Sequence, residues 1–389
     1  MLKTKRIDAA LHAARDMLPG GVAMATTAHD TIYEAAFGAR DAAGSVPMTL
    51  DTVFALASMT KAVVSVAALQ RVDEARLSLD APIGEILPEL AAPQVLVGFD
   101  ADGTARLRPP RNAVTLRHLL SHSAGYGHEA VNAELKLFLE RTGLPATPED
   151  AAQLARWPLL FDPGTRWNYG INTDIVGKAI EAVSGQTLDL EMGRGLLAQL
   201  GMADSGFVLN AERRARHVTT QARGTDGRFT DMGLPFDRPV RWGMGGGGLH
   251  GTGRDYLRFI RMILNAGMHE GTRILSPAGM DAVLQNQLAP RVAVRKMISS
   301  NPAISLNAEF FPGMTKHWSA AFMINTERAT TGRNAGSLAW AGVVNTYCWI
   351  DPTAGIGGVF MTQIMPFYDP HALEAFMAFE NAVYEATGL

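Results

Sequence analysis

The chain has 389 residues, of which 47% are hydrophobic and 19% charged, and its formal net charge is −3 at pH 7. This composition is typical of a soluble globular protein and excludes a disordered, fibrous or coiled-coil chain. Because Lys and Arg form no dense block, neither nucleic acid nor an anionic membrane is expected as the main partner. We expect a small, neutral molecule instead.

The N-terminal segment, residues 1–18, predicts an amphipathic helix, since charged side chains interrupt every apolar run that could serve as a secretory signal. No stretch of the sequence approaches the roughly 18 uncharged apolar residues that span a bilayer. We therefore expect a cytoplasmic protein.

Strand patterns lie toward both ends of the chain. They predict a hairpin from residues 22–28 and 31–37, a short strand at 52–57, and late strands at 319–324, 338–344, 346–350 and 357–364. Helix signals fill the middle and the C-terminus. Helix N-termini are predicted at four positions: Thr147 with Pro148, Thr252, Ser276 with Pro277, and Asp369 with Pro370. A further helix is predicted over residues 173–185.

The simplest architecture pairs both ends of the chain in one antiparallel sheet flanked by terminal helices. We predict an α/β domain from residues 1–75 and 235–389, with a mainly helical domain, residues 76–234, inserted between the two parts. The sequence shows no internal repeat and no low-complexity linker.

Ser58 and Lys61 form a Ser-x-x-Lys sequence where a long apolar run, residues 62–69, indicates a buried helix. A spacing of three places Ser58 Oγ and the Lys61 ammonium one turn apart on the same helical face. The helix N-terminus and the apolar surroundings disfavour a cation, so Lys61 could accept the serine proton and make Ser58 a nucleophile. The alternative is a lysine that reaches solvent beside a capping serine.

Two further segments carry candidate site residues. Tyr169 lies in a loop at the entrance of the helix at 173–185, where its hydroxyl could shuttle a proton between Ser58 and a leaving group. The strand at 338–344 contains small residues that permit close backbone approach, so the N–H of Val343 could join that of Ser58 in an oxyanion hole. Read alone, each segment also fits a structural role.

Other patterns point to no cofactor and no metal. The single cysteine, Cys348, has no second thiol for a disulfide or a thiolate zinc site and is expected to be a buried apolar side chain. His118 and His122 have helical spacing but lack further ligands. Residues 243–248 match Gly-x-Gly-x-x-Gly without a βαβ unit, so we interpret them as a loop beside the active site. No Gly-x-Ser-x-Gly sequence occurs, which excludes an α/β-hydrolase elbow.

Taken in this order, the motifs resemble those of the serine β-lactamase and penicillin-binding protein superfamily, specifically the class C β-lactamase-like family VIII carboxylesterases. The matching segments run along most of the chain, at residues 58–61, 115–125, 169, 245–249, 351–352 and 361–363. The resemblance implies an α/β sandwich plus a helical domain. Ser58 would be the acylated nucleophile, with Lys61 and Tyr169 as the acid/base pair. The N–H groups of Ser58 and Val343 would form the oxyanion hole.

Departures from the β-lactamase pattern bear on the substrate. Lactamases have an asparagine two residues after the tyrosine, where this chain has Ile171. They also have a Lys-Thr-Gly sequence where this chain has Trp-Ala-Gly at residues 340–342. A neutral indole does not anchor the carboxylate of a β-lactam. The substrate-binding residues expected on this basis are Trp340, Ala341, Gly342 and Ile171, with Tyr126, Phe310 and Phe311 as further aromatic candidates.

The predicted function is that of a serine carboxylesterase for small or short-chain esters, acting through an acyl-enzyme on Ser58. An acyltransferase that passes the acyl group to an alcohol or amine remains open, as does a weak β-lactamase or D-Ala peptidase. A non-catalytic binding module with the same fold is the remaining alternative.

Overall fold

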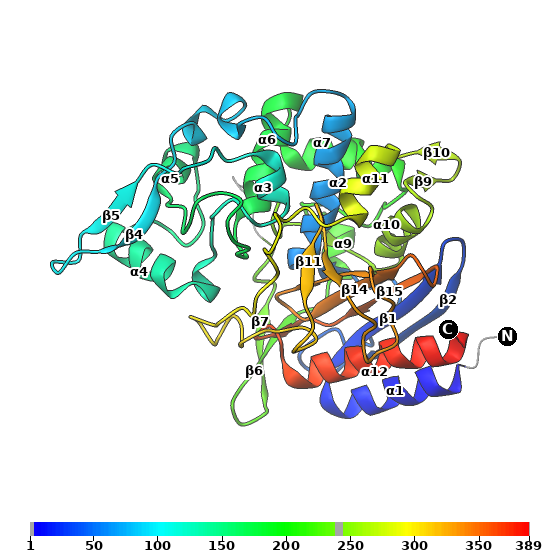
Figure 1. Cartoon of the computed structure of the whole chain (residues 1–389). Helices are drawn as coiled ribbons and strands as arrows, with labels where there is room; N and C mark the ends of the chain where they lie inside the picture. Colours follow the sequence, from blue (N-terminus) through cyan, green and yellow to red (C-terminus); the bar gives the residue numbers. More distant parts are fainter. Residues whose placement is uncertain (1–3, 238–243, 389) are drawn as a thin grey trace.

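The computed structural model describes residues 4–237 and 244–388, and its centre is a seven-stranded sheet in the order β11-β12-β13-β14-β15-β1-β2 (Figure 1). Neighbouring strands are antiparallel throughout, and Ala23 pairs with Phe360 where the two ends of the chain meet. The strands are β1 (Gly20–Thr27), β2 (Thr31–Gly38), β11 (Lys316–Trp318), β12 (Met323–Asn325), β13 (Leu338–Gly342), β14 (Thr346–Asp351) and β15 (Ile356–Met361). The predicted pairing of both chain ends in one antiparallel sheet is confirmed.

Helices cover both faces of this sheet. The terminal helices α1 (Lys5–Met17) and α12 (Pro370–Thr387) lie side by side on one face, and α1 buries Ile7 and Leu11 (Figure 1). The other face carries α2 (Thr60–Asp73), α10 (Gly253–Leu264) and α11 (Pro277–Leu284). Within the described ranges, no helix is long and apolar enough to cross a membrane.

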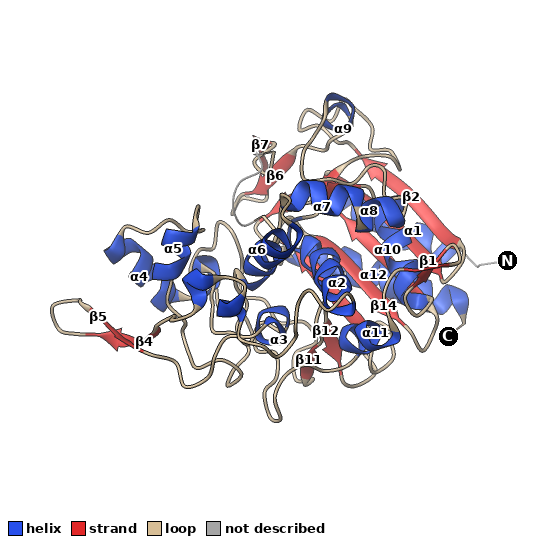
Figure 2. Ribbon diagram, turned by 90° about the horizontal axis from the view of Figure 1, so that it is seen from above, coloured by secondary structure: helices blue, strands red, loops and turns tan. Residues whose placement is uncertain are grey.

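The middle of the chain is mainly helical, and its segments 95–108 and 133–156 lie out to one side of the sheet (Figure 2). Its helices are α3 (Leu116–Leu120), α4 (Ala133–Thr142), α5 (Ala151–Arg156), α6 (Asn172–Ser184), α7 (Leu188–Arg194), α8 (Leu196–Gln199) and α9 (Ala211–Ala215), with the hairpin β4 (Val95–Phe99) and β5 (Ala105–Arg108). Helix α6 packs against α2, which joins this region to the rest of the molecule.

Small sheets complete the structure. They are β3 (Phe54–Ala55) with β8 (His250–Gly251), β9 (Met268–His269) with β10 (Thr272–Arg273), and β6 (Thr220–Arg223) between β16 (Ile364–Met365) and β7 (Phe229–Gly233). Strand β6 lies within the region predicted to be the helical domain, yet it pairs with the C-terminal β16. The domain boundaries themselves stay a prediction.

Helix caps were predicted correctly at three places and wrongly at one. The side chains of Thr252, Ser276 and Asp369 each accept a backbone N–H three residues on. The helix expected from Thr147 begins later, because the Asp150 side chain caps α5 through the N–H of Gln153, 2.7 Å away.

Several predicted strands are shorter than expected: the strand predicted at 338–344 ends at residue 342, and the one predicted at 357–364 ends at residue 361. Residues 319–322 form the turn between β11 and β12 instead of a strand, since Ser319 Oγ accepts the N–H groups of Ala321 and Phe322 at 3.1 and 3.0 Å. Of residues 52–57, β3 contains Phe54 and Ala55. The turn that follows β3 leads directly into the site residues.

Candidate active site

Ser58 lies in a single 3-10 turn, residues 57–59, that leads into α2. The preceding Ala57 has a φ of +46°, a left-handed conformation that costs roughly 1–2 kcal/mol for a residue with a Cβ. Neighbouring backbone holds this turn in place, because the N–H of Leu56 donates to the carbonyl of Leu249 at 2.9 Å. Ser58 itself is partly exposed, as a nucleophile must be.

Lys61 is 6% exposed, and its Nζ lies between two oxygens. Nζ donates to Ser58 Oγ at 3.2 Å and to the carbonyl oxygen of Gly246 at 2.6 Å. It also lies 4.9 Å from the centre of the Tyr169 ring. Lys61 therefore contacts both Ser58 and Tyr169, the residues predicted to act with it, and the alternative of a lysine that extends to solvent is wrong.

Tyr169 stands in the loop before α6, where Trp340 of β13 meets it. The indole Nε1 of Trp340 donates to the Tyr169 hydroxyl at 3.4 Å, and the ring centres are 5.1 Å apart. Trp318 of β11 packs edge-on against Trp340 with centres 4.5 Å apart. The tryptophan that stands in place of the lactamase lysine thus contacts the tyrosine directly.

The His122 ring packs against the Tyr169 ring, with ring centres 4.9 Å apart. Burial, and to a lesser extent the charge of Lys61, hold the pKa of His122 well below its usual range. The imidazole is therefore neutral, and its Nδ1 accepts from the amide of Asn172 at 2.9 Å. His122 acts here as a packed, hydrogen-bonded side chain.

The end of β13 comes close to the serine turn. A Cβ on Gly342 would lie 2.6 Å from the carbonyl oxygen of Leu56, so glycine is required for this approach. Val343 follows in the turn between β13 and β14 and packs on a small buried cluster that includes Ala57. Its backbone is thus near the serine turn, while the oxyanion hole of the Ser58 and Val343 N–H groups stays a prediction.

The remaining pocket predictions have different outcomes. Phe310 lies beside Trp340, with ring centres 6.2 Å apart, and both line a small hollow together with Trp167. Tyr126, in contrast, is fully buried in the core, and the Phe311 ring faces the guanidinium of Arg333 at 5.1 Å. The side chains of Ile171 and Ala341 are each 2% exposed and belong to the core cluster. Their contact with substrate stays a prediction.

The glycine loop lies beside the site, as predicted for residues 245–248, while Gly243 falls outside the described residues. The N–H of Gly246 donates to Oδ1 of Asp174 in α6 at 2.8 Å. Sequence reasoning missed Asp174, whose signal was an acidic residue between the apolar Ile171 and Ile175 at the start of a buried helix.

A family model described as Beta-lactamase matches residues 7–380. The chain belongs to the beta-lactamase family. Its β-lactamase-like fold, predicted from the motifs, is confirmed by a solved mutant of simvastatin synthase (LovD) from Aspergillus terreus, with a TM-score of 0.85, 26% identity and coverage of 100% of this chain and 99% of that one. EstCE1, a hydrolase with promiscuous acyltransferase activity, shares the fold with a TM-score of 0.77 at 21% identity, over 98% of each chain.

Curated relatives in this family include transferases and an esterase. The monacolin J acid methylbutanoyltransferase of Aspergillus terreus is 30% identical over 94% of this chain and 92% of its own length. The lovastatin esterase of Penicillium rubens is 30% identical over 97% of this chain and 98% of its own length. The chain is accordingly an enzyme of the serine hydrolase type with acyl-enzyme chemistry.

Proposed function

We propose that the protein is a serine carboxylesterase of the family VIII type that hydrolyses small or short-chain esters. The observation that carries the proposal is the contact of Lys61 Nζ with Ser58 Oγ at 3.2 Å, beneath the ring of Tyr169. In this pair the amine can take the serine proton as the oxygen attacks. We also propose that the protein is located in the cytoplasm, as expected from the sequence.

The proposed reaction has two halves. Ser58 Oγ bonds to the carbonyl carbon while its proton passes to the pair Lys61 and Tyr169, and the N–H groups of Ser58 and Val343 stabilise the oxyanion. The carbon–oxygen bond to the alcohol then breaks, and the alcohol leaves with a proton from Tyr169. Water attacks the acyl carbon and gives up a proton to the same pair. The bond between the acyl carbon and Ser58 Oγ then breaks, the pair returns the proton to Oγ, and the acid leaves.

A short, neutral substrate suits the surroundings of the serine. Trp340 supplies an apolar wall where lactamases carry a cation, and Ile171, Ala341 and Gly342 add no charge. A small, uncharged acyl group such as acetyl or butyryl is accordingly the substrate that we propose.

The test is release of nitrophenol from p-nitrophenyl acetate, butyrate and octanoate, with nitrocefin in parallel. We expect turnover that falls with chain length and is lost in Ser58→Ala, Lys61→Ala and Tyr169→Phe, while the exposed Lys296→Ala retains it. Nitrocefin turnover that rivals the esters would favour a β-lactamase. Inactivity of the wild type and Ser58→Ala alike, with no acyl adduct by intact mass, would favour a binding module.

Acyl transfer to an alcohol is the second candidate, because the methylbutanoyltransferase of Aspergillus terreus is 30% identical over 94% of this chain. Hydrolysis and transfer share the acyl-enzyme and differ in the group that accepts the acyl chain. Adding an alcohol to the ester assay and measuring new ester against free acid separates the two. Ester as the main product would make the protein a transferase.

A further inference from the structure

Asp174 lies in the first turn of α6, with its side chain buried on the side of the glycine loop. Its Oδ1 accepts the N–H of Gly246 at 2.8 Å. The carbonyl of the same glycine accepts from Lys61 Nζ at 2.6 Å. One glycine therefore connects a buried carboxylate to the lysine that contacts Ser58.

The loop and α6 pack backbone to backbone, so the connection has little freedom. A Cβ on Gly246 would lie 2.7 Å from Oδ2 of Asp174, and a Cβ on Gly245 would lie 2.5 Å from the carbonyl oxygen of Thr173. Neither position has room for a side chain. Asp174 therefore restrains the residue whose carbonyl accepts from Lys61.

Charge adds to this geometry. Burial raises the pKa of Asp174 to about 6, although the Lys61 charge and the Gly246 N–H oppose the rise. Lys61 is the charged group that interacts electrostatically with Asp174, among the described residues of the elements packed around α6, which are α2, α3, α7 and the glycine loop. Tyr169 and the neutral His122 are the titratable groups beside Lys61. Near neutral pH the carboxylate is therefore ionised and faces the lysine.

We infer that Asp174 is a positioning residue for Lys61: through Gly246 it holds the amine against Ser58 Oγ and stabilises the ammonium that forms when the serine proton is taken. The inference rests on the proposed acyl-enzyme function. The role of Asp174 is to orient Lys61 and provide the counter-charge, and the reacting atoms stay with Ser58, Lys61 and Tyr169.

The experiment measures the acylation of Ser58 by p-nitrophenyl acetate, followed as the nitrophenol burst and by intact mass. Asp174→Asn keeps the shape and an acceptor for the Gly246 N–H but removes the charge. We expect its acylation rate near pH 8 to fall about 10-fold to 100-fold, as for a displaced catalytic group, with little change in KM. The loss of wild-type activity on acidification through about pH 6 should be absent from the variant, because its side chain no longer titrates there.

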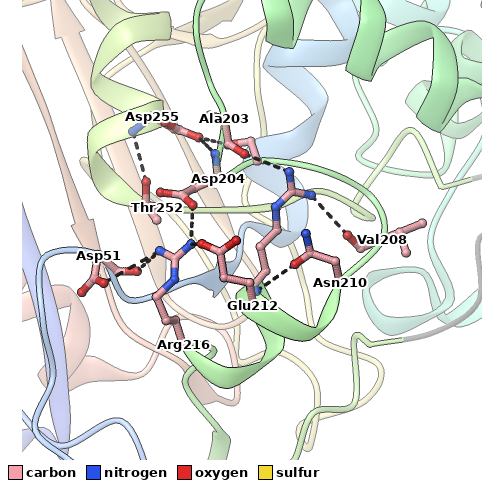
Figure 3. Close-up of polar contacts among 11 residues, drawn as sticks. Asp51, Ala203, Asp204, Val208, Asn210, Glu212, Arg216, Thr252 and Asp255 are labelled. Atoms are coloured by element: carbon pink, nitrogen blue, oxygen red, sulfur yellow. Dashed lines mark hydrogen bonds and ion pairs between the residues drawn. The ribbon is translucent and has the colours of Figure 1, made fainter.

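Asp255→Asn is the matched control. Asp255 also lies in the first turn of a helix, α10, and also accepts a backbone N–H at 2.8 Å, from Asp204 (Figure 3). Burial raises its pKa as well. A purely structural role for Asp174 predicts that both variants lose thermal stability alike and keep the same acylation rate and pH profile.

Gly246→Ala disturbs the contact between Asp174 and Gly246 at the glycine, and it replaces Asp174→Asn in the experiment if that variant does not fold. Its methyl group would displace the carboxylate, so acylation should slow in this variant too. The double variant Asp174→Ala with Gly246→Ala lacks the carboxylate that the new methyl group would displace. Its loss of acylation rate should therefore be smaller than the losses of the two single variants combined. If the wild type is acylated and the acylation rate of Asp174→Asn equals that of Asp255→Asn, the inference is wrong but the proposed function stands. If the wild type forms no adduct on Ser58, the proposed function is wrong as well.

Discussion

The indole Nε1 of Trp340 donates a hydrogen bond to the hydroxyl oxygen of Tyr169 over 3.4 Å. The same tryptophan that makes the site neutral therefore also holds the proposed acid/base tyrosine. The N–H donor restrains the orientation of the hydroxyl that is proposed to pass the proton. Trp340 thus has a second effect beyond the shape of the pocket.

Trp340→Phe tests this hydrogen bond, since it keeps an aromatic ring and removes the N–H. One net hydrogen bond is worth about 1 kcal/mol, which predicts a decrease of kcat/KM for p-nitrophenyl acetate of about threefold to tenfold. Trp349→Phe is the control, because the buried indole N–H of Trp349 has no hydrogen-bond partner within the described part of the chain. Equal kcat/KM values in both variants would contradict the prediction.

Gly342→Ala tests the close approach of β13 to the serine turn. The new methyl group would meet Thr346 Oγ1 and lie 2.6 Å from the carbonyl oxygen of Leu56. Overpacking of this kind costs about 1–3 kcal/mol of unfolding free energy, and the displaced turn should slow acylation at Ser58. Gly193→Ala in α7 is the control, since outside its chain neighbours and its own helix backbone no atom in the described ranges lies within 4 Å of the added Cβ. We expect Gly193→Ala to keep or slightly raise the Tm, and a fully active, equally stable Gly342→Ala would refute the packing argument.

A buried histidine pair predicts acid sensitivity. Nε2 of His217 and Nδ1 of His250 are 3.0 Å apart. Burial lowers the pKa of His217 to about 4 and that of His250 to about 3. The unfolded chain takes up protons on both residues below about pH 6.5 while the folded chain does not, so stability is present above that pH and is lost as the pH falls.

Urea unfolding between about pH 7.5 and 5 measures this loss, which should amount to about 1–2 kcal/mol for each histidine. The variants His217→Asn and His250→Asn should be less stable at neutral pH but show a smaller decrease on acidification. His29→Gln, at an exposed position, should keep the wild-type dependence. A decrease that is the same in all four proteins would place the acid sensitivity elsewhere.

The ion pair between Arg333 and Glu380 is buried, with the side chains 2% and 0% exposed. Two hydrogen bonds of 2.5 and 2.8 Å join the guanidinium to the carboxylate on α12. Arg333→Met should cost about 3–5 kcal/mol of unfolding free energy, because it leaves the buried carboxylate unpaired. The double variant Arg333→Met with Glu380→Leu should recover part of that loss.

The exposed ion pair between Arg254 and Glu34 provides the comparison, with side chains 53% and 35% exposed. Arg254→Met should cost less than about 1 kcal/mol, since solvent already weakens the attraction. Denaturant unfolding of the three variants measures the difference. Similar costs for Arg333→Met and Arg254→Met would mean that the buried pair contributes no more than the surface pair.

The sequence by itself determined the features that depend on neighbours along the chain. A spacing of three residues on a helix brings Ser58 and Lys61 together at 3.2 Å, and side-chain caps begin α10 and α12 at Thr252 and Asp369. The fold class followed from motifs spread along the chain. The spacing and the caps depend on helical periodicity and on hydrogen bonds that span three residues, which are readable without knowing what packs on them, whereas the fold class came from the resemblance of the motifs to a known family.

The tertiary structure decided the features that need distant segments in contact. The carbonyl of Gly246 reaches Lys61, and Asp174 holds that glycine, across sequence separations that no local pattern encodes. Likewise, Phe310 joins Trp340 while Tyr126 is buried in the core, although both are aromatic residues in loops. Local hydrogen bonding and periodicity select the helices, whereas long-range pairing, packing and burial select the strand order and the side chains that share one site.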